Sequence, residues 1–168
     1  MSDCVYPCPC GYYSDSLKPC TCAPSTITKY QKRISGPLLD RIDIHIEVPR
    51  VDYEKLSGNK VSESSEAIRK RVQVARDIQN KRFTNGKATD IVANADMRIG
   101  EIRQFCQLQA EGQSLMRSAM SQLQLSARAY HRILKLARTI ADLAGSEEIQ
   151  SAHLAEALQY RPKIMIGA

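Results

Sequence analysis

The sequence predicts a mainly α-helical chain with a single strand and a Cys-rich loop. Three observations predict this class. Apolar residues recur at helical spacing over most of the chain beyond Tyr53. Only 42–48 alternates strictly between apolar and polar residues, as a half-buried strand does. Five of the six cysteines fall in 1–24, a segment without helical period.

Composition narrows the classes of partner and compartment. The 168 residues suffice for one ordinary domain, or a small domain with an added module. The net charge is +6, and basic residues concentrate in 29–50, 69–82 and 128–138, which favours polyanions but also fits a solvated surface. Without a secretory signal or an apolar run of membrane-spanning length, we expect a cytoplasmic protein with reduced thiols.

The first elements surround the predicted strand. Because 1–24 cannot bury a core of its own, another interaction must order it. A short helix follows, with Ser25 as its predicted N-cap, and breaks at Gly36-Pro37. A lone strand over 42–48 must pair with others, so we expect its sheet upstream of residue 1.

Helices account for the remainder of the chain. They are predicted over 62–84, 94–108, 111–124, 126–144 and 151–160. The pattern is densest in 126–144, where apolar residues repeat at i, i+3, i+4 and i+7. Ser126 is the predicted N-cap of this helix, and Gly145 ends it. Ser151 is the predicted N-cap of the last helix.

The cysteines form two close pairs, Cys8-Pro-Cys10 and Cys20-Thr-Cys22. Four thiolates could enclose Zn²⁺ tetrahedrally, and the metal would then hold together a segment that lacks a core. C-x-C is a less usual zinc spacing than C-x-x-C, so disulfides and unliganded thiols remain alternatives. Cys4 could replace one ligand.

Three blocks of sequence are more specific. They read PCPCGYY at 7–13, RISGPLLDRID at 33–43 and LSARAYHRIL at 125–134. In type and order they resemble the magnesium-chelatase-like family called YifB or ComM, over 7–161. The resemblance implies a ring-forming AAA+ ATPase with ATP and Mg²⁺ as cofactors and, as in ComM, DNA branch migration.

The resemblance also implies a division of the chain. It makes 1–24 a Cys-rich loop, 25–52 the end of the ATPase core with its arginine-finger motif, and 53–168 the helical lid. No G-x-x-x-x-G-K-[ST] phosphate loop occurs here. We therefore expect the rest of the ATPase core upstream in the same protein, a homo-oligomeric ring of the full-length protein, and no ATP hydrolysis by this chain alone. Val5-Tyr6 replaces the family's Met-Asn, so its polar phosphate sensor is either absent or lost at a boundary of this sequence.

Arg41 is the candidate catalytic residue. Ring ATPases place a cation from a neighbouring subunit against the γ-phosphate, and the planar guanidinium suits this role. The resemblance maps Arg41 onto this arginine finger, acting in trans. A local ion pair with Asp40 or Asp43 is the alternative.

Arg128 is the candidate nucleotide-binding residue. It falls in the first turn of a predicted helix, where the macrodipole disfavours positive charge. An arginine beside free N–H groups can, however, clamp a phosphate. The resemblance maps Arg128 onto the sensor arginine. The alternative is a solvated face shared with Arg132, Lys135 and Arg138.

Lys29, Lys32 and Arg33 are candidate nucleic-acid contacts, although few aromatic residues accompany them for base stacking. They also support an alternative function, a non-enzymatic zinc-dependent DNA-binding module. A metal-insertion partner is a third, because of the chelatase kinship.

Overall fold

The computed structural model describes residues 6–15, 17–34, 36–39, 41–48, 51, 63–84 and 90–161. Its helices are α1 (Pro24–Gln31), α2 (Gly36–Leu39), α4 (Ser65–Thr84), the short 3₁₀ helix η1 (Asn94–Asp96), α5 (Ile99–Phe105), α6 (Ala110–Gln122), α7 (Ala127–Leu143) and α8 (Ser151–Gln159). The mainly helical class is confirmed. The division predicted near residue 52 lies outside the described residues. None of the described helices has the length and apolarity that crossing a membrane requires.

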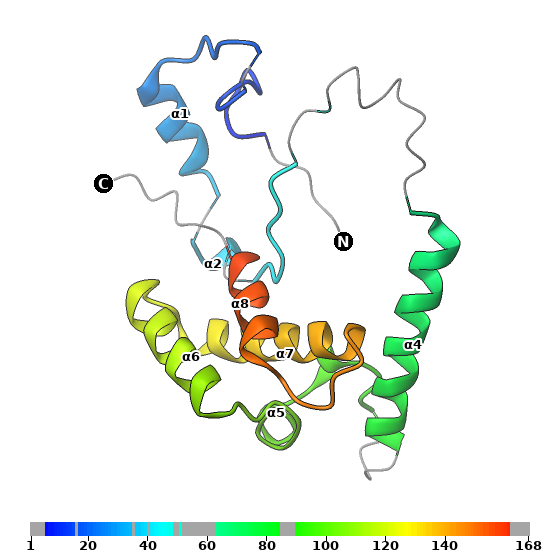
Figure 1. The fold of residues 1–168 in the computed structure, drawn as a ribbon. Helices are drawn as coiled ribbons and strands as arrows, with labels where there is room; N and C mark the ends of the chain where they lie inside the picture. Colours follow the sequence, from blue (N-terminus) through cyan, green and yellow to red (C-terminus); the bar gives the residue numbers. More distant parts are fainter. Residues whose placement is uncertain are drawn as a thin grey trace.

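Helix α7 is the centre of the fold, with α8, α4 and α5 packed around it (Figure 1). Its apolar stripe includes Ile133 and Ala137, which are 1% and 0% exposed. Ser126 caps the helix as predicted, since its Oγ accepts a hydrogen bond from the Ala129 N–H at 3.1 Å. Gly145 follows with a φ of +68°, a left-handed conformation that glycine adopts without strain.

Helix α4 is less buried than its pattern predicts. Ile68 and Val72, on its predicted apolar stripe, are 41% and 40% exposed. The helix buries only Ala75, Gln79 and Phe83. Figure 1 shows the reason, because α4 runs past the end of α7 and its first turns lie beside no other helix of the described chain.

One predicted helix is divided, and two predicted N-caps are wrong. The helix predicted over 94–108 divides at Met97, whose extended ψ of 134° separates η1 from α5. The N-cap of α1 is Ala23 and not Ser25, because the helix begins two residues earlier, with proline. The N-cap of α8 is Gln150, so Ser151 is already its first residue.

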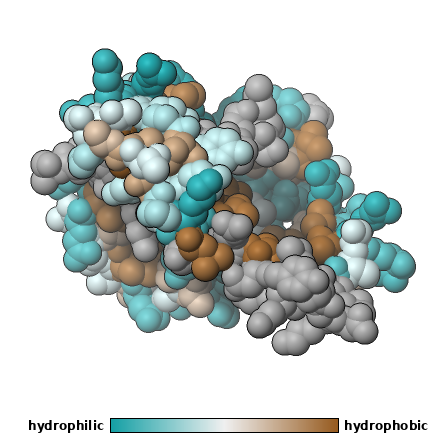
Figure 2. Space-filling model, turned by 90° about the horizontal axis from the view of Figure 1, so that it is seen from above, coloured by the Kyte–Doolittle hydropathy of each residue, from teal (hydrophilic) through white to brown (hydrophobic). Residues whose placement is uncertain are grey.

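The predicted strand over 42–48 is not formed, and the described chain contains no strand. A strand needs a hydrogen-bonded neighbour, whereas here the His45 N–H donates to the Tyr160 carbonyl at 2.8 Å. The alternating apolar residues are exposed, Ile46 to 68% and Val48 to 83%. Figure 2 shows one face of the molecule, on which exposed apolar side chains, in brown, lie beside hydrophilic ones. An isolated parallel bridge joins Leu108 and Ile149 instead.

A buried polar network joins α4 to α7. Asp142, whose side chain is 0% exposed, forms ion pairs with Arg82 at 2.5 Å and Arg138 at 3.0 Å. Asn94 adds its Nδ2, which donates to Asp142 Oδ2 at 2.7 Å. Arg138 also donates to the Ser146 carbonyl at 2.6 Å. These bonds fix α4 and the turn after α7 in one arrangement, because each is directional.

Candidate metal cluster and cationic groove

The four paired cysteines converge on one point. The Sγ of Cys8 lies 3.3 Å from that of Cys10 and 3.7 Å from that of Cys20. The Sγ atoms of Cys10 and Cys20 are 3.5 Å apart. With Cys22, all four lie within 4.8 Å of one another. The alternative of a disulfide is not realised, since the described cysteines are free, and Cys4 lies outside the described residues.

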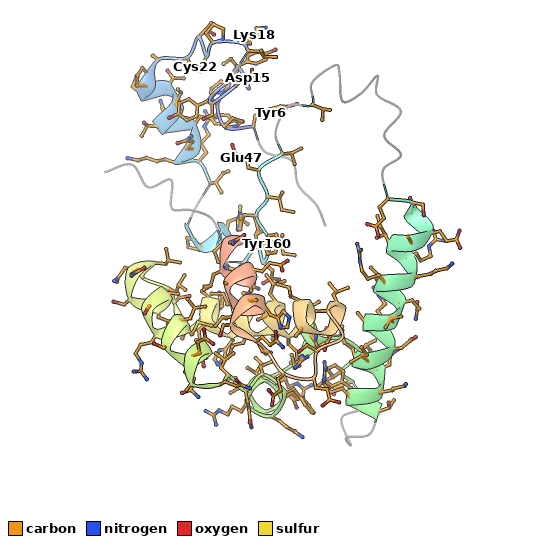
Figure 3. All side chains as sticks on the ribbon, viewed as in Figure 1. Tyr6, Asp15, Lys18, Cys22, Glu47 and Tyr160 are labelled. Carbon is orange, nitrogen blue, oxygen red and sulfur yellow. The ribbon has the colours of Figure 1, made fainter. Side chains whose placement is uncertain are left out.

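Turns and one helix contact bring the cysteines together. Gly11 has a φ of +82°, and its N–H donates to the Cys8 carbonyl at 3.0 Å, which closes the first turn. The Asp15 carboxylate accepts from the Leu17 N–H at 2.8 Å. Figure 3 shows Asp15, Lys18 and Cys22 gathered above α1, away from α7. Gln31 at the end of α1 donates to the Pro7 carbonyl at 3.1 Å, so α1 and the loop form one unit.

The spacing of the sulfur atoms fits a tetrahedral metal. With Zn–S bonds of about 2.3 Å, the ligand atoms of a four-sulfur site lie about 3.8 Å apart. The three measured Sγ separations, 3.3 to 3.7 Å, are close to this value. Hydrogen bonds from the backbone of Tyr12 and Thr21 lower the pKa of the Cys10 thiol to about 5. Because all four sulfur atoms lie within 4.8 Å of one another, the cluster could hold a metal ion, with all four positions supplied by the chain.

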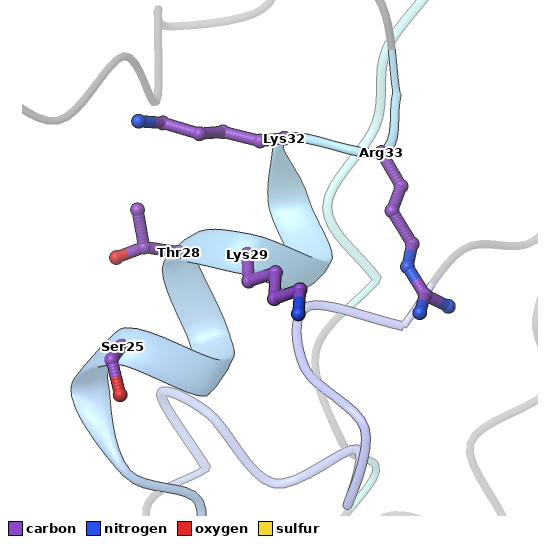
Figure 4. A pocket seen from close by; sticks show the side chains of 5 residues that line it. All are labelled: Ser25, Thr28, Lys29, Lys32 and Arg33. Carbon is purple, nitrogen blue, oxygen red and sulfur yellow. The ribbon is translucent and has the colours of Figure 1, made fainter.

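The predicted nucleic-acid contacts share one groove beside this cluster. It has a volume of about 430 Å³ and is lined by Ser25, Thr28, Lys29, Lys32 and Arg33. In Figure 4, Lys32 and Arg33 extend from the end of α1 in different directions. The groove thus presents separate cations, which suits several phosphates along a strand better than a single bound phosphate.

Arg41 does not form the predicted alternative ion pair with Asp43. Its guanidinium is exposed and donates to the Pro37 carbonyl at 2.9 Å. Asp43 pairs instead with Arg132 at 2.9 Å. Asp40 lies outside the described residues. The charge of Arg41 is therefore not neutralised by the described acid nearest to it in sequence.

Arg128 lies in a second, cationic groove between α5 and α7. The groove has a volume of about 290 Å³ and is lined by Met97, Arg98, Ile99, Ile102, Arg128, His131, Arg132 and Lys135. Arg98 pairs with Asp90, and Lys135 donates to the Ala95 carbonyl at 2.7 Å. No described residue pairs with the exposed Arg128. Its guanidinium is thus the part of this groove open to an anion.

The solvated face predicted around Arg128 is only partly correct. Arg138 is 3% exposed and belongs to the Asp142 network. Arg132 is half-buried, and its guanidinium contacts Asp43 and the Arg41 carbonyl. Sequence reasoning missed both roles. An arginine among the apolar residues of α7 was the available signal for Arg138, whereas the local sequence carries none for Arg132.

Comparison with known proteins adds the family. Residues 62–161 match the family described as magnesium chelatase, subunit ChlI C-terminal, and residues 3–56 match magnesium chelatase, subunit ChlI. Competence protein ComM of Haemophilus influenzae is 40% identical over 162 residues, 95% of this chain and 30% of that protein. YifB of Escherichia coli is 40% identical over 156 residues, 92% of this chain and 29% of that protein.

A third relative, YifB of Salmonella typhimurium, is 36% identical over 156 residues. This chain spans about 30% of the length of these relatives. The ChlI C-terminal match covers more than half of the chain, including α4 to α8. This chain therefore belongs to the magnesium chelatase ChlI C-terminal family and is homologous to ComM and YifB.

Proposed function

We propose that this chain is the C-terminal part of a ring-forming AAA+ ATPase that couples ATP hydrolysis to DNA remodelling, as in ComM-like branch migration. Arg41 acts in trans as the arginine finger, and Arg128 is the sensor arginine. The upstream core holds the phosphates and Mg²⁺. The observation that carries this proposal is the exposed Arg128 at the start of α7, in a groove lined by further cations.

The electrostatics of this groove support nucleotide binding. Arg128 lies at the N-terminal end of α7, where the helix contributes partial positive charge. Arg98, Arg132 and Lys135 already contact carboxylate or carbonyl oxygens of the chain, which leaves Arg128 to bind a phosphate. A guanidinium placed this way offers two parallel donors to phosphate oxygens.

Arg128→Ala is the test in the complete ATPase. We expect its Kd for a fluorescent ATP analogue to rise about tenfold, the loss of one charge-assisted hydrogen bond. Arg117→Ala is the matched control, because this arginine is also exposed but lies on α6, outside the groove. Equal nucleotide affinity for wild type and Arg128→Ala would refute the sensor role.

For the cysteine cluster we propose a structural Zn²⁺ bound by Cys8, Cys10, Cys20 and Cys22. The sulfur separations and the absence of disulfides among the described cysteines support this choice. A closed four-thiolate site supplies folding energy and leaves no position for catalysis. The metal would hold the loop against α1, where Ile27 is that helix's only buried residue.

Elemental analysis after zinc-supplemented expression is expected to find about one zinc per chain. Cys20→Ser should lose most of it. Cys106→Ala should keep it, since Cys106 lies outside the cluster and burial raises the pKa of its thiol to about 11. A metal-free wild-type protein, or disulfides among the four cysteines by mass spectrometry, would argue against the site.

Lys29, Lys32 and Arg33 are the proposed DNA contacts. The hydrogen bond between Gln31 and the Pro7 carbonyl connects their helix to the cysteine cluster. This connection also favours the second candidate function, a zinc-dependent DNA-binding module without enzymatic activity. Salt-sensitive DNA binding by the chain, lost on chelation, combined with no ATPase activity of the complete protein, would support the module.

A further inference from the structure

We propose that Arg132 is a positioning residue that ties the segment carrying Arg41 to the helix carrying Arg128. The inference rests on the proposed function, because it concerns those two arginines. Arg132 Nη1 lies 2.9 Å from Asp43 Oδ1 and also donates to the Arg41 carbonyl. One guanidinium thus holds both ends of the turn over residues 41–43.

The end of α8 holds the same segment from a second side. Arg161, which is 7% exposed, donates to the Ile42 carbonyl at 3.3 Å and to the Ala129 carbonyl of α7 at 3.4 Å. The Tyr160 carbonyl accepts from the His45 N–H at 2.8 Å. Figure 3 shows Tyr160 at the end of α8, below the segment that carries Glu47. Residues 41–45 therefore follow any movement of α7 and α8.

Arg132 also links the turn that carries Arg41 to the groove around Arg128. Arg128 and Arg132 are four residues apart, so they lie on one face of α7, and both line the same groove. The side chain of Arg41 leaves the turn that Arg132 holds and reaches back to the Pro37 carbonyl. A nucleotide that draws Arg128 inward would move α7, and through Arg132 it would reorient Arg41 toward the neighbouring subunit.

This ion pair contributes little to folding. The side chain of Arg132 is 27% exposed and that of Asp43 is 57% exposed, and such accessible pairs are weakly stabilising. The buried core around Ile133 and Leu154 holds α7 and α8 together without it. Substitution of Arg132 should therefore leave the fold intact, which separates positioning from stability.

The test is steady-state ATP hydrolysis by the complete ATPase. We expect Arg132→Ala to lower kcat about tenfold and to leave KM within about twofold, because the substitution misplaces a group that acts in the transition state. Arg117→Ala is the matched control. This exposed arginine lies on α6, outside the groove that Arg132 lines, so neither constant should change. A rise in KM alone for Arg132→Ala would mean direct nucleotide binding and overturn the positioning role.

A double variant separates this inference from the proposed function. Arg41→Ala with Arg132→Ala should be no slower than Arg41→Ala alone, because residues that act through one another are not additive. Multiplied losses would overturn the inference, as would wild-type kcat for Arg132→Ala when Arg41→Ala is impaired. Wild-type kcat for Arg41→Ala would instead refute the proposed function. If Arg132→Ala fails to fold, Asp43→Asn should lower kcat in the same direction, and unchanged kcat there would overturn the inference.

Discussion

Replacing Asp142 with alanine is expected to lower the free energy of unfolding by about 3–5 kcal/mol. The carboxylate is 0% exposed and accepts hydrogen bonds from Arg82, Arg138 and Asn94. Without it, the guanidinium of Arg138, itself 3% exposed, remains buried with its counter-charge removed. The two arginines that share this carboxylate would then lie close together without it, and this repulsion and desolvation cost more than the lost contacts themselves.

Urea denaturation followed by circular dichroism measures this loss. Glu66→Ala is the control, because Glu66 is 74% exposed and its pair with Lys70 is accessible to solvent, so its effect should stay within about 0.5 kcal/mol. Asp142→Asn keeps the shape but not the charge and should fall between the two. A loss below about 1 kcal/mol for Asp142→Ala would show that the network does not hold α4 to α7.

Arg41→Ala is expected to lower kcat of the complete ATPase about 10³-fold, the size of an arginine-finger contribution. KM should change little, because the guanidinium stabilises charge that develops on the γ-phosphate only during hydrolysis. The side chain is exposed, and the described contact it makes is with the neutral Pro37 carbonyl. In the proposed ring, it would therefore be available to a neighbouring subunit.

The trans arrangement has its own test. Mixing Arg41→Ala subunits with subunits whose upstream phosphate loop is inactivated should restore part of the activity, since some interfaces then combine an intact finger with an intact loop. Neither variant alone should recover. An Arg41→Ala protein with kcat within about twofold of wild type, or mixed rings without any recovery, would contradict this role.

A helix could be predicted correctly where the residues that form its apolar stripe and its ends all lie in one local stretch of sequence. In α7 the apolar spacing, the Ser126 cap and the Gly145 end all belong to one local sequence, and all were correct. The pattern of 42–48 is equally clear, but a strand depends on a neighbour that the described chain does not provide. The break at Met97 escaped prediction because buried Asn94 is held by Asp142, 48 residues away.

In the candidate site, too, contacts between residues close in sequence could be predicted, and contacts between distant residues could not. Two C-x-C pairs indicated a metal cluster, because ligands close in sequence are close in space. The partners of Arg132 lie about 90 residues away, so its role depends on tertiary structure. The burial of Arg138 could not be read from its charge, since an arginine enters a core only when acceptors such as Asp142 are already there.

The polar network beneath α4 has a mechanical consequence. Apolar contacts alone would let α4 slide along α7, whereas the bidentate hydrogen bonds from Arg82 to Asp142 fix the angle between the two helices. Arg82 lies near one end of this 20-residue helix, which spans about 30 Å, and the first turns project beyond α7 (Figure 1). A rotation of α7 by about 10° would therefore sweep the far tip through roughly 5 Å. The C-terminal end of α4 is thus fixed to α7, and a small rotation there becomes a larger displacement at the N-terminal end.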